Sequence, residues 1–220
     1  MPKRTTNTCT LQSLATACAA LPCPVPQSAV PALHEYLTLL MRYNAVMNLV
    51  GTRTWRDTLE VLLSDSFYLA EFLRNLPLPE APLCVEPGAG AGLPGIPLRM
   101  AWQQGDYTLI EVRQKRALFM NTVLARVSLP CTRVYQGRIE DFCAAMPAPA
   151  DMWVSRAFMP WRDVLALAAP YTRVGGVVVF LLLEPAPQTL PQGWTLLRTQ
   201  RYTVRDATRW FWALARTPDN

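Results

Sequence analysis

The spacing of hydrophobic positions along the chain changes near residue 82. Before this point apolar residues recur every three or four positions, which is typical of amphipathic helices. Three helices are expected there, over residues 11–20, 31–51 and 55–73. Thr54 or Asp57 can cap the third helix. Pro77, Pro79 and Pro82 then separate this helical region from the rest of the chain.

From residue 83 onward, short apolar runs alternate with helical patterns. Strands are expected over residues 83–86, 107–112, 132–136, 152–155 and 176–183, with helices at 95–103, 114–127, 140–145 and 161–169. This alternation predicts an α/β protein with an open, doubly wound and mainly parallel sheet. Two further strands, 194–204 and 209–216, predict a C-terminal antiparallel hairpin. We therefore predict a helical N-terminal region, residues 1–80, packed on an α/β domain of residues 81–220.

Composition adds limits on the class of protein. The net charge is +5 and nearly all the basic residues are arginine. Arginine suits phosphate and guanine, but so small an excess is equally compatible with ordinary solvated charge. The six cysteines include no C-x-x-C pair and there is one histidine, His34, so no metal site is expected. We interpret the cysteines as reduced thiols of a cytoplasmic protein. No run approaches the ~20 apolar residues of a membrane span, and polar residues interrupt the signal-like start after Lys3.

The residues with the clearest chemical signal join the first predicted strand to the next helix. Gly88, Gly90 and Gly92 stand at alternate positions after an acid, Glu86. The dinucleotide fingerprint Gly-x-Gly-x-x-Gly would need a glycine where Leu93 stands. The pattern instead resembles motif I of S-adenosylmethionine methyltransferases, in which an acid near the sulfonium charge of the cofactor is sensible. A tight strand-to-helix turn without a ligand is the alternative.

The ends of the following strands carry further candidates. Glu111 ends the second strand, where an acid can accept both hydroxyls of a ribose. Ile139 and Glu140 follow the third strand and can contact an adenine, although acids at a helix start also complement its dipole. Arg156 ends the fourth strand and is expected to face the substrate or the cofactor carboxylate. These strand ends share one edge of a parallel sheet, so they predict one ligand site.

Several motifs occur in a recognisable order. They are Asn44–Gly51, Asp65–Ser66, Glu86–Pro97 with its Gly-Leu-Pro-Gly-Ile-Pro, Lys115–Arg116, Arg138–Glu140 and Ser155–Ala157. Together they resemble the RsmG (GidB) family of bacterial small-subunit ribosomal RNA guanine-N7 methyltransferases. The resemblance covers about residues 30–216. It implies a Rossmann-like class I methyltransferase domain over residues 81–220 that takes its methyl group from S-adenosylmethionine.

The resemblance also implies roles for single residues. Cofactor contacts fall on Gly88, Leu93, Ile139, Glu140 and Arg156, with Glu111 at the ribose. Lys115, Arg116 and Arg209 then lie on the RNA side, and Arg156 and Arg209 are the catalytic candidates, able to donate to guanine O6 or to hold a phosphate. The implied partner is small-subunit ribosomal RNA or a pre-ribosomal subunit, bound by a monomer without metal.

The chain departs from the family pattern on the substrate side. Leu62 stands where the family usually has histidine, and Leu182 or Leu183 where it usually has lysine. These departures leave open a non-catalytic RNA-binding protein, or a methyltransferase with another RNA or small-molecule acceptor. An NAD-dependent oxidoreductase is disfavoured by Leu93. Arginines mixed with aromatic residues between Trp194 and Arg216 suit unpaired RNA, or a sheet edge whose rings pack inward.

Overall fold

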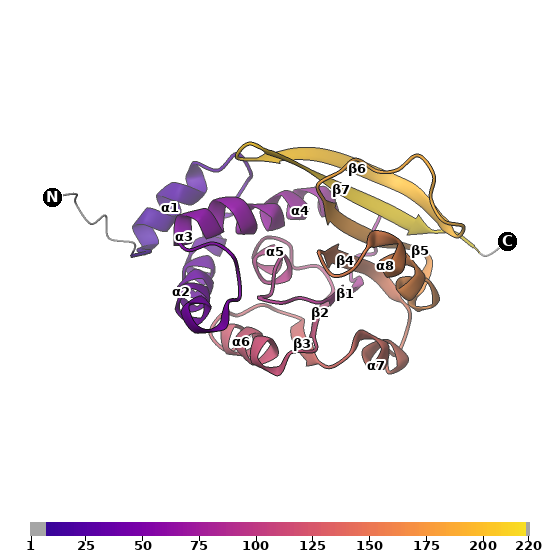
Figure 1. Cartoon of the computed structure of the whole chain (residues 1–220), viewed down its shortest axis with the longest axis horizontal. Helices are drawn as coiled ribbons and strands as arrows, with labels where there is room; N and C mark the ends of the chain where they lie inside the picture. Colours follow the sequence, from indigo (N-terminus) through magenta and orange to yellow (C-terminus); the bar gives the residue numbers. More distant parts are fainter. Residues whose placement is uncertain (1–7, 219–220) are drawn as a thin grey trace.

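The computed structural model describes residues 8–218, which form one seven-stranded sheet with helices on both faces (Figure 1). The strands are β1 Leu83–Pro87, β2 Asp106–Glu111, β3 Thr132–Gln136, β4 Ala150–Arg156, β5 Thr172–Leu182, β6 Trp194–Val204 and β7 Ala207–Arg216. Their order across the sheet is β3-β2-β1-β4-β5-β7-β6. The first five strands are parallel, and β7 runs antiparallel to both β5 and β6. The predicted doubly wound sheet with a terminal hairpin is confirmed.

Helices connect the parallel strands. They are α5 Gly95–Ala101, α6 Gln114–Leu124, α7 Ile139–Ala144 and α8 Trp161–Ala168, the last followed by the short 3-10 helix η3 Ala169–Tyr171. Each lies where the sequence pattern predicts a helix, with ends that differ by up to three residues. Each helix carries the chain back across the sheet, so the next strand runs in the same direction as the one before. The carboxyl ends of β1 to β5 therefore lie together at one edge of the sheet.

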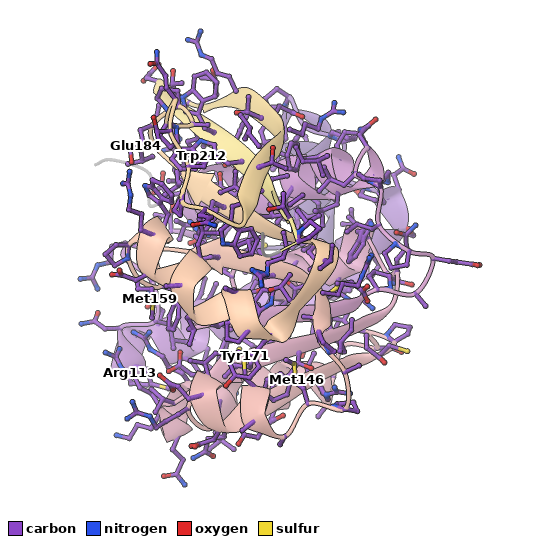
Figure 2. All side chains as sticks on the ribbon, turned by 90° about the vertical axis from the view of Figure 1, so that its right-hand side faces the viewer. Arg113, Met146, Met159, Tyr171, Glu184 and Trp212 are labelled. Atoms are coloured by element: carbon purple, nitrogen blue, oxygen red, sulfur yellow. The ribbon has the colours of Figure 1, made fainter. Side chains whose placement is uncertain are left out.

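The two faces of the sheet bury separate apolar clusters because side chains alternate along a strand. On β5, Val177 and Val179 belong to the cluster on the side of the N-terminal helices, whereas Val178 and Phe180 belong to the other. The second cluster is covered by α7 and α8 (Figure 2). There Trp212 Nε1 donates to the carbonyl of Glu184 at 3.1 Å, which fastens the β5–β6 connection to β7. β5 is therefore buried on both of its faces.

The N-terminal region contains α1 Leu11–Ala19, the 3-10 turn η1 Gln27–Ala29, α2 Val30–Met47 and one long helix from Trp55 to Arg74. The long helix consists of α3 Trp55–Asp57, a π-helical segment η2 Thr58–Leu63 and α4 Ser64–Arg74. Its cap is Thr54, whose hydroxyl oxygen accepts from Asp57 N at 3.1 Å. The helix was predicted, but its π-helical segment was not.

The helical region and the sheet share one apolar cluster. Leu14 of α1, Leu37 of α2 and Phe67 of α4 are fully buried in the cluster that contains Cys84 and Leu109 of the sheet. The division of the chain at residue 80 stays a prediction. Within residues 8–218, no helix has both the length and the apolar character needed to cross a membrane. The signal-like start at Lys3 lies outside the described residues.

Candidate active site

The loop after β1 takes a backbone form that favours glycine. Gly88, Gly90 and Gly92 have φ values of 66°, 61° and 79°, where residues with a side chain are strained. The amides of Gly92 and Leu93 donate to the carbonyl of Ala89, which closes the turn, and α5 begins shortly afterwards. The glycines therefore keep the loop tight and leave its outer surface without side chains.

Glu111 ties the end of β2 to this loop. Its carboxylate is buried, with Oε2 accepting from Gly90 N and Oε1 accepting from Arg113 N, each at 2.9 Å. A carboxylate oxygen has two acceptor positions, so each oxygen keeps one for a ligand hydroxyl. From the other side, the hydroxyl of Tyr36 on α2 donates to the carbonyl of Ala91 at 2.9 Å. The loop is thus held by the sheet and by the helical region.

Two cavities meet at Gly88. The first has a volume of about 240 Å³ and is lined by Gly88, Ile110, Glu111, Val112, Gly137, Arg138, Ile139, Glu140 and Phe158. The second, of about 210 Å³, is lined by Leu49, Val50, Gly51, Leu62, Gly88, Ala89, Gly90, Ala91, Leu93, Arg156 and Ala157. Neither reaches the ~300 Å³ at which ligand pockets usually begin. An extended ligand would need both and would cross the loop at Gly88.

Glu86 does not line either cavity. Its side chain is buried beneath α5, where Oε2 accepts from the hydroxyl of Tyr107 at 2.6 Å. A side-chain carbon added at Gly95 would stand within contact of that same oxygen, so the helix rests directly on the carboxyl group. Burial raises the pKa of Glu86 to about 7, against a smaller lowering by the Tyr107 hydrogen bond. The carboxyl group therefore lies under the loop. A contact between Glu86 and the sulfonium of the cofactor stays a prediction.

A third cavity, of about 220 Å³, contains both predicted catalytic arginines around one buried acid, Asp65. Arg209 Nη1 donates to the two oxygens of Asp65 at 2.6 and 2.5 Å, and Arg156 Nη2 lies 3.3 Å from Oδ2. The hydroxyl of Tyr202 donates to Oδ1 at 3.0 Å. Two arginines share one carboxylate, so the cluster keeps a net positive charge in a site that is largely shielded from water.

The π-helical segment supplies the remaining partners of these arginines. Arg156 Nη1 donates to the carbonyl of Leu62 at 3.4 Å, and Arg209 Nη1 to that of Val61 at 2.9 Å. A π segment widens the helix and disturbs the usual bonding of its carbonyl groups. The carbonyls of this segment are therefore available to orient both guanidinium groups, and Arg209 Nε stays buried without a partner among the described residues.

Strand register explains how Arg209 reaches the site. Trp210 of β7 pairs with Leu182, at the carboxyl end of β5. Because β7 is antiparallel to β5, its first residues lie beside the last residues of β5, at the edge where Arg156 ends β4. The amino end of β7 thus places Arg209 beside the carboxyl ends of the parallel strands.

The predicted RNA-binding residues fall into two places. Lys115 and Arg116 begin α6 after β2, and a side-chain carbon added at Gly90 would stand 3.6 Å from Arg116 Nη1. Arg209 lies on β7, with β1, β4 and β5 between it and β2. At about 4.8 Å per strand, this separates the two groups by roughly 20 Å. They lie along one edge and do not form a single cluster.

The structure adds residues that the sequence reasoning did not select for the site. Asp65 stood out only as part of a motif, yet a buried acid on an otherwise apolar helix face is a signal that could have identified it. Phe158 lies against Gly88 in the first cavity, and no sequence pattern indicated it. The departures from the family pattern also line the site, Leu62 in the second cavity and Leu182 and Leu183 in the third.

Side chains of residues 8–218 form no group of three or more histidine, cysteine or acidic residues placed to hold a metal ion. Glu140, a predicted adenine contact, is half exposed and lies 3.5 Å from Arg138 Nε in an ion pair, whereas Ile139 beside it is buried. The exposed carboxylate and the buried apolar side chain both line the first cavity. Together they suit a flat ring whose face is apolar and whose edge carries polar groups.

Comparison with known proteins identifies the family. Residues 29–189 match the family model GidB, described as rRNA small subunit methyltransferase G. A curated relative from Nitratidesulfovibrio vulgaris, named ribosomal RNA small subunit methyltransferase G, is 54% identical over 83% of this chain and 84% of its own. One of the same name from Oleidesulfovibrio alaskensis is 47% identical over 90% of both chains.

Solved structures agree on the fold. An O-methyltransferase from Bacillus cereus in complex with SAH superposes with a TM-score of 0.65 at 14% identity, covering 94% of this chain and 100% of the other. A putative O-methyltransferase from Klebsiella pneumoniae gives a TM-score of 0.63 at 13% identity, over 94% and 99%. The chain therefore shares the fold of these two proteins over nearly its whole length. By its match to the family model and to its close relatives, the chain belongs to the GidB family, rRNA small subunit methyltransferase G.

Proposed function

We propose that this protein transfers the methyl group of S-adenosylmethionine to N7 of a guanine in small-subunit ribosomal RNA. It is an S-adenosylmethionine-dependent ribosomal RNA methyltransferase by family, and its relatives carry that activity in their names. The observation that supports the proposal most directly is the row of cavities, which runs from Glu111 past Gly88 to Arg156 and Arg209. A non-catalytic role is not favoured.

The residues present fit the cofactor. All three glycines have positive φ, and at Gly90, which is partly exposed, an added side-chain carbon would meet no atom closer than Arg116 Nη1 at 3.6 Å. Glu111 keeps acceptor positions for the ribose hydroxyls, and the first cavity, with Ile139, suits the adenine. The second cavity, bounded by Leu93 and Arg156, would take the methionine part. When bound, the cofactor supplies an electrophilic methyl group on a sulfonium.

The chain's own residues have a limited task in this chemistry. Guanine N7 carries a free lone pair, so no side chain must remove a proton before attack. Positioning of the two reactants can supply roughly 7–11 kcal/mol of the barrier. Arg156 and Arg209 are fixed by Asp65 and by the carbonyls of the π segment, and they keep donors for guanine O6 or a phosphate. The apolar walls at Leu62 and Leu182 exclude water.

The remaining proposals concern partners. Lys115 and Arg116, at the start of α6, contact the RNA backbone at one end of the site while Arg209 faces the target base at the other. The substrate is ribosomal RNA or a pre-ribosomal subunit, the protein acts as a monomer, and it works in the cytoplasm, where ribosomes are assembled.

Methyl transfer from labelled S-adenosylmethionine to unmethylated small-subunit ribosomal RNA tests the proposal. We expect one labelled guanine whose N7-methyl is identified by mass spectrometry of the digested RNA. Ribosomal RNA from a deletion strain should lack the same modification. An unchanged inventory of N7-methylguanosine in that strain would rule the proposal out.

A further inference from the structure

A fourth cavity lies beside the site on the side of the helical region. Its volume is about 620 Å³, larger than each cavity at the sheet edge and within the range of ligand pockets, about 300–1,000 Å³. Its walls come from the end of α1, from the long helix and from the end of the hairpin: Leu21, Pro22, Arg56, Glu60, Tyr68 and residues 200–205. None of the predicted site residues lines it.

Tyr202 joins this cavity to the cluster of Asp65, Arg156 and Arg209. It lines both this cavity and the one that contains Arg156 and Arg209, and its hydroxyl donates to Asp65 at 3.0 Å. Its ring is stacked on Phe211, with centroids 4.3 Å apart and planes 13° apart, so it is fixed in place. One tyrosine therefore separates the place proposed for the target guanine from the fourth cavity.

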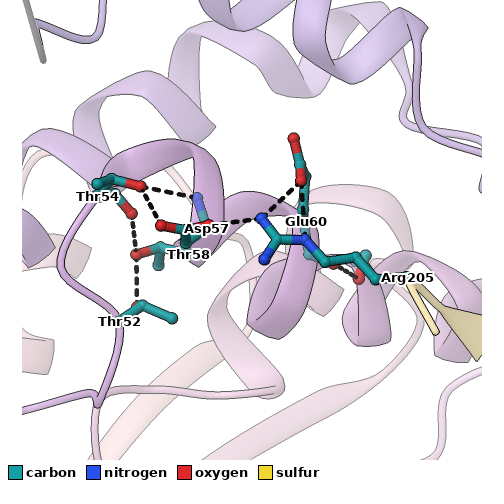
Figure 3. A network of polar contacts seen from close by, with 7 residues as sticks. Thr52, Thr54, Asp57, Thr58, Glu60 and Arg205 are labelled. Carbon is teal, nitrogen blue, oxygen red and sulfur yellow. Dashed lines mark hydrogen bonds and ion pairs between the residues drawn. The ribbon is translucent and has the colours of Figure 1, made fainter. Parts of the chain in front are cut away.

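The hairpin end that forms one wall is held by charge. Arg205, in the turn between β6 and β7, donates through Nη2 to Asp57 at 2.5 Å and to Glu60 at 2.8 Å (Figure 3). Thr54 in turn donates to the other oxygen of Asp57 at 2.6 Å. The cavity is thus formed before any ligand arrives, and the charge of Arg205 is already compensated.

Arg56 and Tyr68 are side chains of the wall that remain available to a ligand. Arg56 is exposed, lies 4.6 Å above the ring of Trp55, and forms no ion pair with any residue between 8 and 218. Tyr68 is partly exposed and its ring lies 4.9 Å from that of Tyr202. An uncompensated guanidinium suits a phosphate, and a partly exposed aromatic ring suits an unpaired base.

We propose that this cavity binds one unpaired nucleotide of the RNA substrate, a neighbour of the guanine that is methylated. The base lies against Tyr68 and the phosphate lies at Arg56. The proposal rests on the proposed function, because it places the two nucleotides on either side of Tyr202. It is the chemistry of single-stranded RNA, in which splayed bases stack on aromatic rings while basic groups follow the backbone.

Filter binding of an unmethylated small-subunit ribosomal RNA transcript, over a series of salt concentrations, tests this assignment. We expect Tyr68→Leu to raise the Kd about tenfold, since one stacked base is lost, and Tyr68→Phe to stay close to wild type because the ring remains. Arg56→Gln should also weaken binding and make the slope of log K against log salt less negative by about 0.7, the value for one phosphate contact on a single strand.

Arg162→Gln is the matched control. Arg162 is also exposed and also lies over the tryptophan before it, at 4.1 Å from the Trp161 ring, but it belongs to α8 on the opposite face of the sheet. It should bind RNA like wild type. Wild-type affinity and salt slope in both Arg56→Gln and Tyr68→Leu would overturn the proposal. Calorimetric binding of adenosine monophosphate that Tyr68→Leu abolishes, with RNA affinity unchanged, would overturn it in favour of a free nucleotide.

Methyl transfer measured on the same transcript separates this proposal from the proposed function. If wild type methylates the RNA and both variants show an unchanged KM, the fourth cavity is not an RNA site and the methyltransferase assignment stands. If wild type binds the RNA with the expected variant effects but transfers no methyl group to it, the proposed reaction is wrong and the nucleotide site stands.

Discussion

Glu86 gives the sharpest test of how the glycine loop is supported. Its carboxyl group is 2% exposed and bonded to Tyr107, and its Oε1 has no hydrogen-bond partner among the described residues. Burial raises its pKa from 4.5 to about 7. Between those values the folded protein holds a proton that the unfolded chain has released, so stability falls as pH rises. The shift corresponds to about 3 kcal/mol, of which about 2.5 kcal/mol is lost between about pH 5 and about pH 8.

Glu86→Gln removes this ionisation while keeping the shape of the side chain. The glutamine oxygen can accept from Tyr107, but its buried amide lacks an acceptor, which costs about 1–3 kcal/mol at every pH. We therefore expect the variant to be less stable than wild type near pH 5 and about equal to it near pH 8. Urea denaturation of both proteins across this range measures the difference, in which the titration of all other groups cancels.

A difference in unfolding free energy that stays constant from pH 5 to pH 8 would refute the reasoning. Tyr107→Phe provides a second check, because losing the hydrogen bond that lowers the Glu86 pKa should move the pH-dependent window upward. Calorimetry with S-adenosylmethionine addresses the proposed cofactor contact. A carboxylate that supports the loop from beneath should change the affinity only a few-fold in Glu86→Gln, whereas direct contact with the sulfonium would cost much more.

Three further predictions concern the site. Gly90→Asp should abolish cofactor binding in calorimetry without unfolding the protein. The control Gly175→Asp, where φ is 78° and an added carbon would likewise lie 3.6 Å from an arginine Nη1, should bind the cofactor normally; equal affinities of the two variants would show that the loop is not the cofactor site. Asp65→Asn should lower the unfolding free energy by about 3 kcal/mol and stop methyl transfer, because two partly buried guanidinium groups lose their buried counter-charge. Asp57→Asn, on the surface, should have a smaller effect on both quantities, and a reversed order would contradict this. Lys115→Gln should weaken RNA binding at all sequences and lower the salt slope by about 0.7 without changing cofactor affinity; an unchanged slope would place the RNA elsewhere.

Local pattern was enough to predict that several candidate site residues share one edge of the sheet. Gly88, Glu111 and Arg156 follow predicted parallel strands, and parallel strands connected by helices bring such positions to one edge. The first two line one cavity and Arg156 lines the next. The ordered motifs, read together, led to the family that the comparisons then confirmed.

Other features depended on packing between distant segments. The π segment Thr58–Leu63 reads as ordinary helix in sequence, because helical periodicity does not distinguish one extra residue in a turn. Glu86 precedes the glycines in sequence, and the alternation of side chains on β1 places its carboxyl under α5, a burial that the sequence pattern did not indicate. Phe158 became part of the site only through its approach to Gly88.

The sequence by itself determined the order of strands and helices, the glycine loop and the family, because these depend on periodicity and on residues close together along the chain. The tertiary structure decided which charges meet. Asp65 and Arg209 are 144 positions apart, and they bond only because β7 turns back beside β5 and the long helix packs across that edge. Side-chain spacing predicts an element and the face it buries, but the partner of a buried charge is set by how the elements pack.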